Sequence, residues 1–187
     1  MATASQQPTV FDYASPTTWR IKFARIPKVE WFCTNVTLPG ITLGEALYPT
    51  PMLDTYLSGD KLTFETLSAT FLVDEELQNY RELWDWMVGI GAPKNHEQFS
   101  AALSGGSTPI ARMPASKGTT PSEGGLYDDA TLIVYNSKNI AKVNIQFKQI
   151  FPTSLSGLNY AQDATDVDYF RADATFRFMY YEFETAT

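Results

Sequence analysis

The alternation of apolar and polar residues predicts that most of this chain is β-strand. Near the start, Trp19, Ile21 and Phe23 alternate with Arg20 and Lys22, the pattern of a strand with one buried face. Comparable strands are predicted at residues 29–41, 61–73, 130–136, 142–151 and 173–183. We therefore expect a mainly β (β+α) fold, with an antiparallel β-barrel or β-sandwich protomer and one flanking α-helix.

Three local details refine this picture. In residues 61–73 the apolar phase slips by one position near Glu65 and Thr66, which predicts a β-bulge. A turn is expected at Asn136–Asn139, between two of the strands. The last strand is predicted to be continuous, with one face formed by Ala174, Phe176, Phe178 and Tyr180.

Residues 43–60 are predicted to form a long loop or an irregular hairpin. The segment contains Pro49 and Pro51 and ends with Ser-Gly-Asp at 58–60, all of which favour turns. It also carries large apolar residues that have no predicted core to join: Leu47, Tyr48, Met52, Leu53, Tyr56 and Leu57. Because exposed apolar groups of this kind lower solubility, we expect a partner to cover the segment.

The main helix is predicted at residues 75–90. Asp74 is a suitable N-cap, and Glu75 and Glu76 place negative charge where the helix dipole favours it. The sequence Gly-Ile-Gly-Ala-Pro at 89–93 predicts the end of the helix. At helical spacing one apolar stripe, expected to face the core, consists of Leu77, Tyr80, Trp84, Met87 and Val88.

A second apolar ridge lies beside that stripe and consists of Leu83, Trp86 and Ile90. A helix that lies on one sheet does not need both to be buried. Either Trp86 folds over the edge of the core or is covered by a loop, or the ridge makes a side contact with a partner.

The remaining segments suggest one domain, residues 1–187, with two appendages. Residues 1–17 are small, polar and proline-containing, which favours a mobile N-terminal arm. A shorter helix is expected at about 95–103. Residues 104–125 are mostly Gly, Ser, Thr and Pro, which predicts a flexible insertion.

Composition narrows the function classes. The chain has a net charge of −7 and no cluster of Lys and Arg, which argues against tight binding of a phosphate backbone. No apolar run is long enough to span a bilayer, and the first residues lack the pattern of a secretory signal. We therefore expect no membrane contact and synthesis in a reducing cytosol.

Candidate catalytic and metal-binding residues are sparse. The single histidine, His96, has no second histidine at the spacing of a zinc helix. The paired carboxylates Glu75/Glu76 and Asp128/Asp129 fit a helix start and a strand start better than acid–base catalysis. The acidic run at 163–168 lacks the spacing of a calcium loop, and Cys33 suits a buried position. No catalytic residue, metal or cofactor is expected.

The order of these features resembles the tail tube proteins of contractile-tailed bacteriophages. The features are "LPGI" at 38–41, "SGD" at 58–60, the strand "LTFETLSATFLV", the helix start "DEELQNYRELWDW", "FKQIFPTSLSGLNY" at 147–160 and the last aromatic strand. They extend over nearly the whole chain from about residue 19. The Gly/Ser/Pro-rich segment 104–125 departs from shorter members of the family.

The resemblance implies a protomer that is similar in fold to the haemolysin-coregulated tube protein of type VI secretion. It implies hexameric rings that stack into a tube inside a sheath, with the loop at about 44–60 reaching the adjacent ring. The implied partners are copies of itself, the tail sheath protein, and the baseplate and tape-measure proteins. DNA would pass through the lumen without specific binding, and the location would be the virion, after assembly in the host cytoplasm.

Physical arguments agree with this implication. A protomer of this size cannot enclose duplex DNA, because a barrel needs 16–18 strands merely to form an aqueous pore. A negative lumen would repel DNA and ease its transit, which suits the acidic composition. The alternatives are a tube-like baseplate or tube-end protein that forms a single ring, a binding module for another virion protein, and a soluble enzyme.

Overall fold

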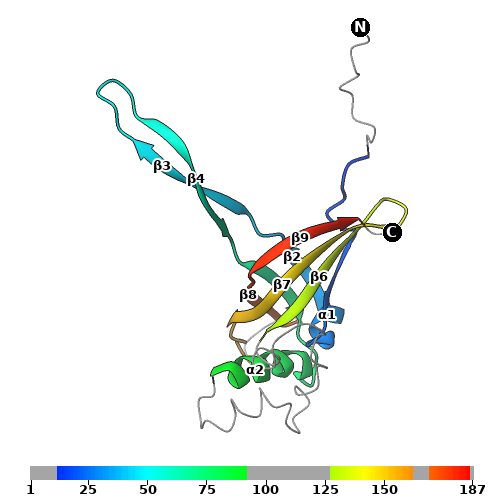
Figure 1. The fold of residues 1–187 in the computed structure, drawn as a ribbon. Helices are drawn as coiled ribbons and strands as arrows, with labels where there is room; N and C mark the ends of the chain where they lie inside the picture. Colours follow the sequence, from blue (N-terminus) through cyan, green and yellow to red (C-terminus); the bar gives the residue numbers. More distant parts are fainter. Residues whose placement is uncertain (1–11, 92–126, 162–168, 186–187) are drawn as a thin grey trace.

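The computed structural model describes residues 12–91, 127–161 and 169–185 (Figure 1). In these ranges the chain forms nine strands and two α-helices. Their bounds are β1 Trp19–Phe23, α1 Pro27–Phe32, β2 Cys33–Thr37, β3 Ile41–Tyr48, β4 Thr55–Phe64, β5 Leu67–Leu72, α2 Gln78–Gly91, β6 Asp128–Tyr135, β7 Ala141–Leu155, β8 Arg171–Arg177 and β9 Tyr180–Thr185.

Some of the predicted segments lie outside these ranges. The expected helix at 95–103, the insertion at 104–125, His96 and the acidic run at 163–168 are not among the described residues. The predicted N-terminal arm lies partly outside them. Its residues 12–17 are exposed and precede β1.

The body consists of two antiparallel sheets that share β7. One sheet, called sheet A here, has the order β1-β6-β7-β9. The other, called sheet B, has the order β2-β5-β8-β7. The first part of β7 pairs with β9 through Val143–Lys148, and its last part pairs with β8 through Phe151–Leu155. The expected antiparallel β-architecture is confirmed.

The shared strand turns from one sheet into the other at Gln149, whose φ is 54°. The Asp129 carboxylate fastens this corner, because it accepts the Gln149 N–H at 3.1 Å and the Lys148 ammonium at 3.0 Å. The partner strand bends at the same level, where the Met179 N–H donates to the Lys148 carbonyl at 2.9 Å. The prediction of one continuous strand at 173–183 is therefore wrong. β8 ends at Arg177 and β9 starts at Tyr180. The chain breaks there because β8 and β9 both pair with β7 and must follow its bend.

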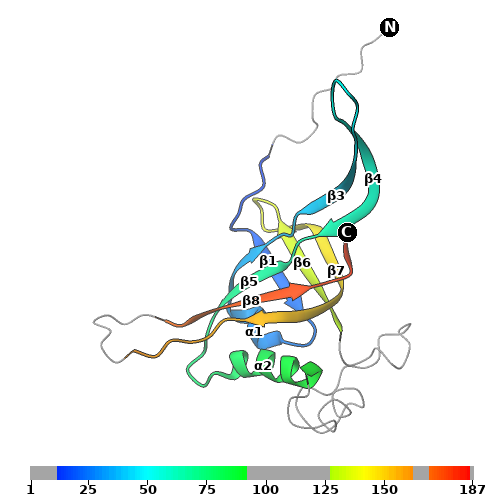
Figure 2. The same ribbon diagram turned by 90° about the vertical axis from the view of Figure 1, so that its left-hand side faces the viewer.

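The core lies between the inner faces of the two sheets. In β5, Leu67, Ala69 and Phe71 are buried, and the residues between them are not. In β8, Phe176 is buried and its ring lies 5.2 Å from that of Phe23 in β1, centroid to centroid. Figure 2 shows α2 lying across one end of the body beside α1.

Although Tyr80 of the predicted core stripe packs against the core, the buried face of α2 is not centred on that stripe. Its buried residues are Asn79, Leu83 and Trp86, whereas Trp84 of the predicted core stripe is 50% exposed. The side-contact ridge proposed from the sequence is therefore wrong for Leu83 and Trp86, which are 0% and 1% exposed. Ile90, the third residue of that ridge, is partly buried and packs against the core.

The physical reason is a polar anchor at the start of the helix. The Asn79 side chain donates to the Leu72 carbonyl at 2.7 Å, and its Oδ1 accepts the Asp74 N–H at 3.3 Å. These bonds tie the helix to the end of β5 and fix its rotation, so that residues 79, 83, 86 and 90 face inward. A periodicity argument that counts asparagine as a surface residue misses this stripe.

The helix boundaries also differ from the prediction. Asp74 does act near the start, because its carboxylate accepts the Asn79 N–H at 3.4 Å. However, the helix begins at Gln78, so Glu75 and Glu76 lie before it, and it continues through Gly89 to Gly91.

Two other local predictions are corrected. Residues 29–41 are not one strand, because Pro27 starts the short helix α1, whose Val29 is buried, and β2 follows. The slip at Glu65 and Thr66 is a break between β4 and β5 and not a bulge within one strand. For residues 43–60 the structure decides between the two alternatives, since they form a hairpin with one shift of register between Leu43 and Glu45 and not a long loop. The turn at Asn136–Asn139 is confirmed, with the Asn139 N–H donating to the Asn136 carbonyl at 3.0 Å.

Candidate assembly surfaces

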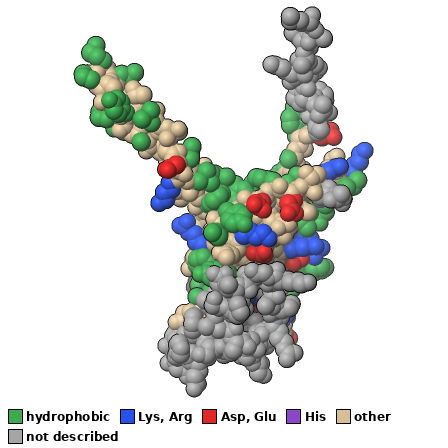
Figure 3. Space-filling model, in the orientation of Figure 1, with side chains coloured by type: hydrophobic (Ala, Val, Ile, Leu, Met, Phe, Trp, Pro, Cys, Tyr) green, Lys and Arg blue, Asp and Glu red, His purple; other side chains and the backbone are tan. Residues whose placement is uncertain are grey.

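The most prominent surface is the hairpin of β3 and β4, called the arm here, which projects far beyond the body (Figure 1). No described residue outside the hairpin pairs with either of its strands. Figure 3 shows hydrophobic side chains gathered at its outer end. All the apolar residues predicted for a ring-stacking loop lie there and are between 54% and 95% exposed: Leu47, Tyr48, Met52, Leu53, Tyr56 and Leu57.

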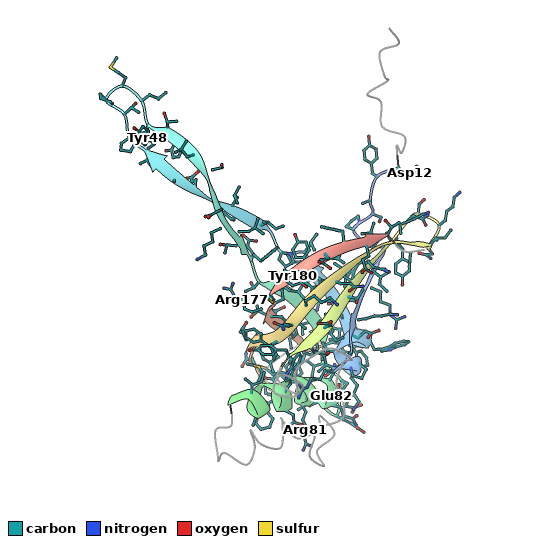
Figure 4. All side chains as sticks on the ribbon, in the orientation of Figure 1. Asp12, Tyr48, Arg81, Glu82, Arg177 and Tyr180 are labelled. Atoms are coloured by element: carbon teal, nitrogen blue, oxygen red, sulfur yellow. The ribbon has the colours of Figure 1, made fainter. Side chains whose placement is uncertain are left out.

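The base of the arm is attached to the body by aromatic packing. The ring of Phe64 lies 5.6 Å from that of Phe178 and 5.4 Å from that of Tyr181. The Tyr181 hydroxyl also donates to the Pro39 carbonyl at 3.3 Å. Figure 4 shows Arg177 and Tyr180 near this base and Tyr48 near the far end. The arm therefore starts from a fixed point and leaves its outer part free for a partner.

Midway along the arm the two strands approach closely. The pairing changes register between Leu43 and Glu45, so that Gly44 faces a bulge in β4. A Cβ atom added at Gly59 would lie 2.6 Å from the Gly44 carbonyl oxygen. This position requires glycine, and the bulge adds twist between the inner and outer halves of the arm.

A second surface is the pair of open edges of sheet A. Among the described residues β1 pairs with β6 alone and β9 with β7 alone, so each has one edge without a strand partner in that part of the chain. Arg20 and Lys22 lie on the outward side of β1, and Glu182 and Glu184 lie on the outward side of β9. Open edges of this kind invite pairing with another chain.

A groove of about 660 Å³ lies beside the β1 edge. Its lining includes Trp19 of β1, Trp31 of α1 and Cys33 of β2. An ion pair of 2.9 Å between Arg20 and Glu30 lies at this groove. This lining contains no arrangement of nucleophile and base.

The candidate chemical groups behave as structural groups. Burial raises the pKa of the Cys33 thiol to about 11, which keeps it protonated and unreactive at neutral pH. Burial also raises the pKa of Asp128, whose carboxylate accepts the Arg25 N–H at 2.8 Å. Among the described residues there is no group of side chains that could hold a metal ion. In that same part of the chain no helix is long and apolar enough to cross a membrane.

Comparison with known proteins gives a likeness in structure alone. No protein-family model matches the sequence, and no curated protein matches it significantly. A chain of the sheath/tube terminator of PVC, an extracellular contractile injection system, has a TM-score of 0.55 and 15% identity over 97% of this chain and 99% of that chain. A chain of the PVC sheath–tube complex has a TM-score of 0.52 and 15% identity over 99% and 100%.

The chain has a tail-tube-like fold. A third structure with this fold is the anti-feeding prophage baseplate in its 6-fold symmetrised form, in which one chain has a TM-score of 0.51 and 11% identity over 96% of this chain and 97% of that chain. The resemblance inferred from the order of motifs is thus confirmed at the level of the fold. The open edges of sheet A were not predicted, because strand order cannot be inferred from alternation.

Proposed function

We propose that this protein is a structural subunit of a contractile tail tube, which forms hexameric rings that stack into a tube and pass DNA on injection. The observation that carries the proposal is the open, four-stranded sheet A with free edges at β1 and β9. The strands alternate in direction across this sheet, so β1 and β9 are antiparallel. Copies related by rotation could therefore join β9 to the next β1 and continue an antiparallel sheet around a ring.

The charges on these edges support such a joint. Arg20 and Lys22 would meet Glu182 and Glu184 of the neighbouring copy. Complementary charges at an interface favour the correct register and speed association.

The width of such a ring fits DNA. Six copies would give a barrel of about 24 strands, and a spacing of about 4.8 Å with a tilt of about 40° gives a backbone diameter of about 48 Å. A side-chain layer of about 5 Å on each wall leaves roughly 38 Å, more than the roughly 20 Å of duplex DNA. The 6-fold symmetry of the similar baseplate structure is consistent with this number of copies.

The outward face of sheet A would line the lumen. Figure 3 shows acidic and basic side chains together on this face. It carries Asp129, Glu182 and Glu184, but also Lys142 and Lys148 beside the basic residues of β1. On this geometry the lumen wall would be mixed in charge and not acidic as expected. It would still lack a continuous row of positive charges, which is what would hold the phosphates of DNA.

The arm would join successive rings. Its exposed apolar end, residues 47–57, is the surface that a neighbouring ring would cover. The tail sheath, the baseplate and the tape-measure protein remain proposed partners, in a virion assembled in the host cytoplasm. No cofactor takes part in this function.

A second candidate is a tube-end or baseplate protein that forms one ring. The similarity to chains of a sheath/tube terminator and of a baseplate favours it, since both structures contain chains with this fold. A tube subunit polymerises by itself or on a seed, whereas a tube-end protein stops at one ring.

Electron microscopy of the purified protein, with and without a seed, tests the proposal. We expect rings and tubes, and deletion of residues 50–57 should leave rings but abolish tubes. Only monomers at high concentration would contradict the function, and long tubes from the deletion variant would contradict the role of the arm.

The edge joint has its own test. Lys22→Glu should weaken ring formation, and Glu182→Lys in the same chain should partly restore it. Lys138→Glu, in the exposed turn between β6 and β7, is the matched control and should have no effect. Equal effects of the two lysine substitutions would show that the β1 edge is not a joint.

A further inference from the structure

The Arg20 guanidinium, which the edge joint would bring to a neighbouring copy, already has a partner within the single chain. Its Nε and Nη2 atoms donate to Oε1 of Glu30 at 3.2 and 2.9 Å. Glu30 belongs to α1, and its side chain is 14% exposed, whereas that of Arg20 is 48% exposed. This contact is called the edge ion pair here. Its carboxylate end is largely covered, and its guanidinium end is open to solvent.

The edge ion pair lies on the open side of β1. The Tyr135 N–H donates to the Thr18 carbonyl at 3.0 Å, and from this pair onward the hydrogen-bonded residues of β1 alternate. Arg20 therefore turns its backbone toward β6, and Ile21 turns its N–H and carbonyl to the open edge. The Arg20 side chain starts on the outward face of β1 and ends at α1, whose Val29 is buried in the core. It thus passes the edge at the place where a neighbouring strand would bind.

The charges define one register for a joint with β9 of the next copy. Arg20 and Lys22 are two residues apart in β1, and Glu182 and Glu184 are two residues apart in β9. In an antiparallel pair only one alignment gives both basic residues an acidic partner, with Arg20 opposite Glu184 and Lys22 opposite Glu182. Arg20 would then have two carboxylates to choose between, that of Glu30 in its own chain and that of Glu184 in the next.

The apolar side chains agree with this register. Phe183 lies on the same face of β9 as Tyr181, with 5.6 Å between the ring centroids, but Tyr181 packs against the core and Phe183 is 62% exposed. In this alignment Phe183 would lie opposite Ile21, beside the groove that includes Trp19 and Trp31. Both members of the edge ion pair line the same groove. An incoming β9 would therefore have to displace the edge ion pair.

Charged side chains at a sheet edge are a common protection against pairing with another chain. We propose that the edge ion pair is an autoinhibitory contact, which keeps the β1 edge closed in the single chain. Ring formation exchanges Glu30 for Glu184 of the incoming copy as the partner of Arg20. On the side of the incoming copy, Glu184 exchanges a hydrogen bond from the Gln146 amide for the new ion pair. This inference rests on the proposed function and adds the regulation of its edge joint.

An exchange differs from a simple attraction in its effect on assembly. One ion pair of Arg20 is broken for each one that forms, so Arg20 adds little net affinity and Lys22 supplies the gain. Removal of the Glu30 charge should favour rings, because Arg20 keeps its partner in the ring and loses the competing one in the single chain. A partly exposed ion pair changes an equilibrium about two- to fivefold, which is the expected size of the effect.

The experiment measures, by sedimentation velocity at fixed salt, the concentration at which half of the protein is in rings. Glu30→Gln should lower this half-assembly concentration about two- to fivefold. Glu82→Gln is the matched control. It changes the net charge equally and also breaks an ion pair of α1, that of Lys28 with Glu82 at 3.3 Å, but neither residue lines the groove at the β1 edge. It should leave the half-assembly concentration unchanged, and the Tm of each variant checks that it is folded.

A second measurement leaves Glu30 in place. A joint without autoinhibition predicts that Arg20→Gln and Lys22→Gln weaken ring formation to a similar extent. The exchange predicts that Arg20→Gln raises the half-assembly concentration at least twofold less than Lys22→Gln, because only Arg20 gives up a partner on joining. Both side chains are on the exposed face of β1, so this comparison remains available even if Glu30→Gln does not fold.

The outcomes separate the two proposals. An unchanged or raised half-assembly concentration in folded Glu30→Gln would overturn the autoinhibition and leave the tube function intact. Equal shifts from Glu30→Gln and Glu82→Gln would also overturn it, since net charge alone would then explain the effect, and so would equal losses from Arg20→Gln and Lys22→Gln. Rings from Glu30→Gln at concentrations where the unmodified protein is monomeric would support the inference. Failure of the unmodified protein and of all variants to form rings would refute the proposed function, and the inference with it.

Discussion

Replacing Trp86 and Trp84 one at a time by alanine would show directly which face of α2 is buried. The two residues have the same side chain, in the same helix, two positions apart. Trp86 is 1% exposed, its ring lies 6.4 Å from that of Phe176, and the Arg25 guanidinium lies 5.1 Å from its centroid. Trp84 is 50% exposed.

The expected magnitudes differ severalfold. Truncation of a buried tryptophan to alanine costs about 3–5 kcal/mol, because burial is lost and a cavity remains. In a domain of this size 1 kcal/mol corresponds to about 2–4 °C, so Trp86→Ala should lower Tm by about 6–20 °C. Trp84→Ala removes a ring that is only half buried and should cost at most about 1 kcal/mol, or about 4 °C.

Urea unfolding followed by far-UV circular dichroism is the suitable assay, at protein concentrations where rings do not form. Tryptophan fluorescence would confound the comparison, because both variants lose a fluorophore. Trp86→Phe should retain part of the stability, since it leaves a smaller cavity. Equal losses in the two alanine variants, or a larger loss for Trp84→Ala, would refute the burial of Leu83 and Trp86 and restore the ridge as a surface.

Other predictions concern the arm, the thiol and the corner of β7. Gly59→Ala should disorder the outer arm, because the added Cβ would lie 2.6 Å from a backbone oxygen. Limited proteolysis should then cut the arm faster, while the Tm of the body stays unchanged. Gly157→Ala, where a Cβ would have nothing within 4 Å, is the control. Cys33 in the folded protein should react with a disulfide reagent at pH 8 about a hundredfold more slowly than a free thiol, because its pKa is about 11 and not 9.0. Reaction at the rate of the unfolded chain would show that the thiol is accessible. Asp129→Asn keeps an acceptor for the backbone but weakens the side-chain hydrogen bond to Lys148 and removes the negative charge, which together raise the pKa of Lys148. It should therefore lower Tm by at most about 4 °C at pH 8. Since the raised pKa stabilises the fold only while the ammonium is charged, this difference should vanish as the pH rises above that pKa; a difference that persists there would show another cause.

Strand patterns were predictable wherever one face of a strand is buried. Ile21 and Phe23 in β1, and Val143, Ile145 and Phe147 in β7, follow the alternation that the sequence shows, because a period of two places them on one side of the sheet. The sequence also predicted a buried position for Cys33 and a place at the start of a strand for Asp128. In the structure Cys33 is held as the protonated thiol, and Asp128 is buried at the first position of β6. The apolar content of residues 47–57 likewise predicted a segment outside the core, and its large apolar residues are exposed.

The rotation of α2 could not be predicted in this way. Its two apolar stripes are adjacent, and periodicity favours the stripe of five residues over the ridge of three, whereas the residues buried most deeply belong to the ridge. The choice depends on Asn79, whose hydrogen bonds reach residues of the preceding strand and its exit, Leu72 and Asp74. A polar residue that acts as an anchor has no signature in a hydrophobic pattern.

By itself, the sequence determined the β-rich class, the single main helix, the apolar arm and the acidic, motif-poor composition. Each depends on neighbours along the chain or on totals over it. Only the tertiary structure decided that β7 serves two sheets, that β8 and β9 bend with it at Gln149, and that β1 and β9 are left as open edges. Strand order and helix rotation are set by contacts between residues far apart in sequence, and these contacts create the surfaces on which assembly would depend.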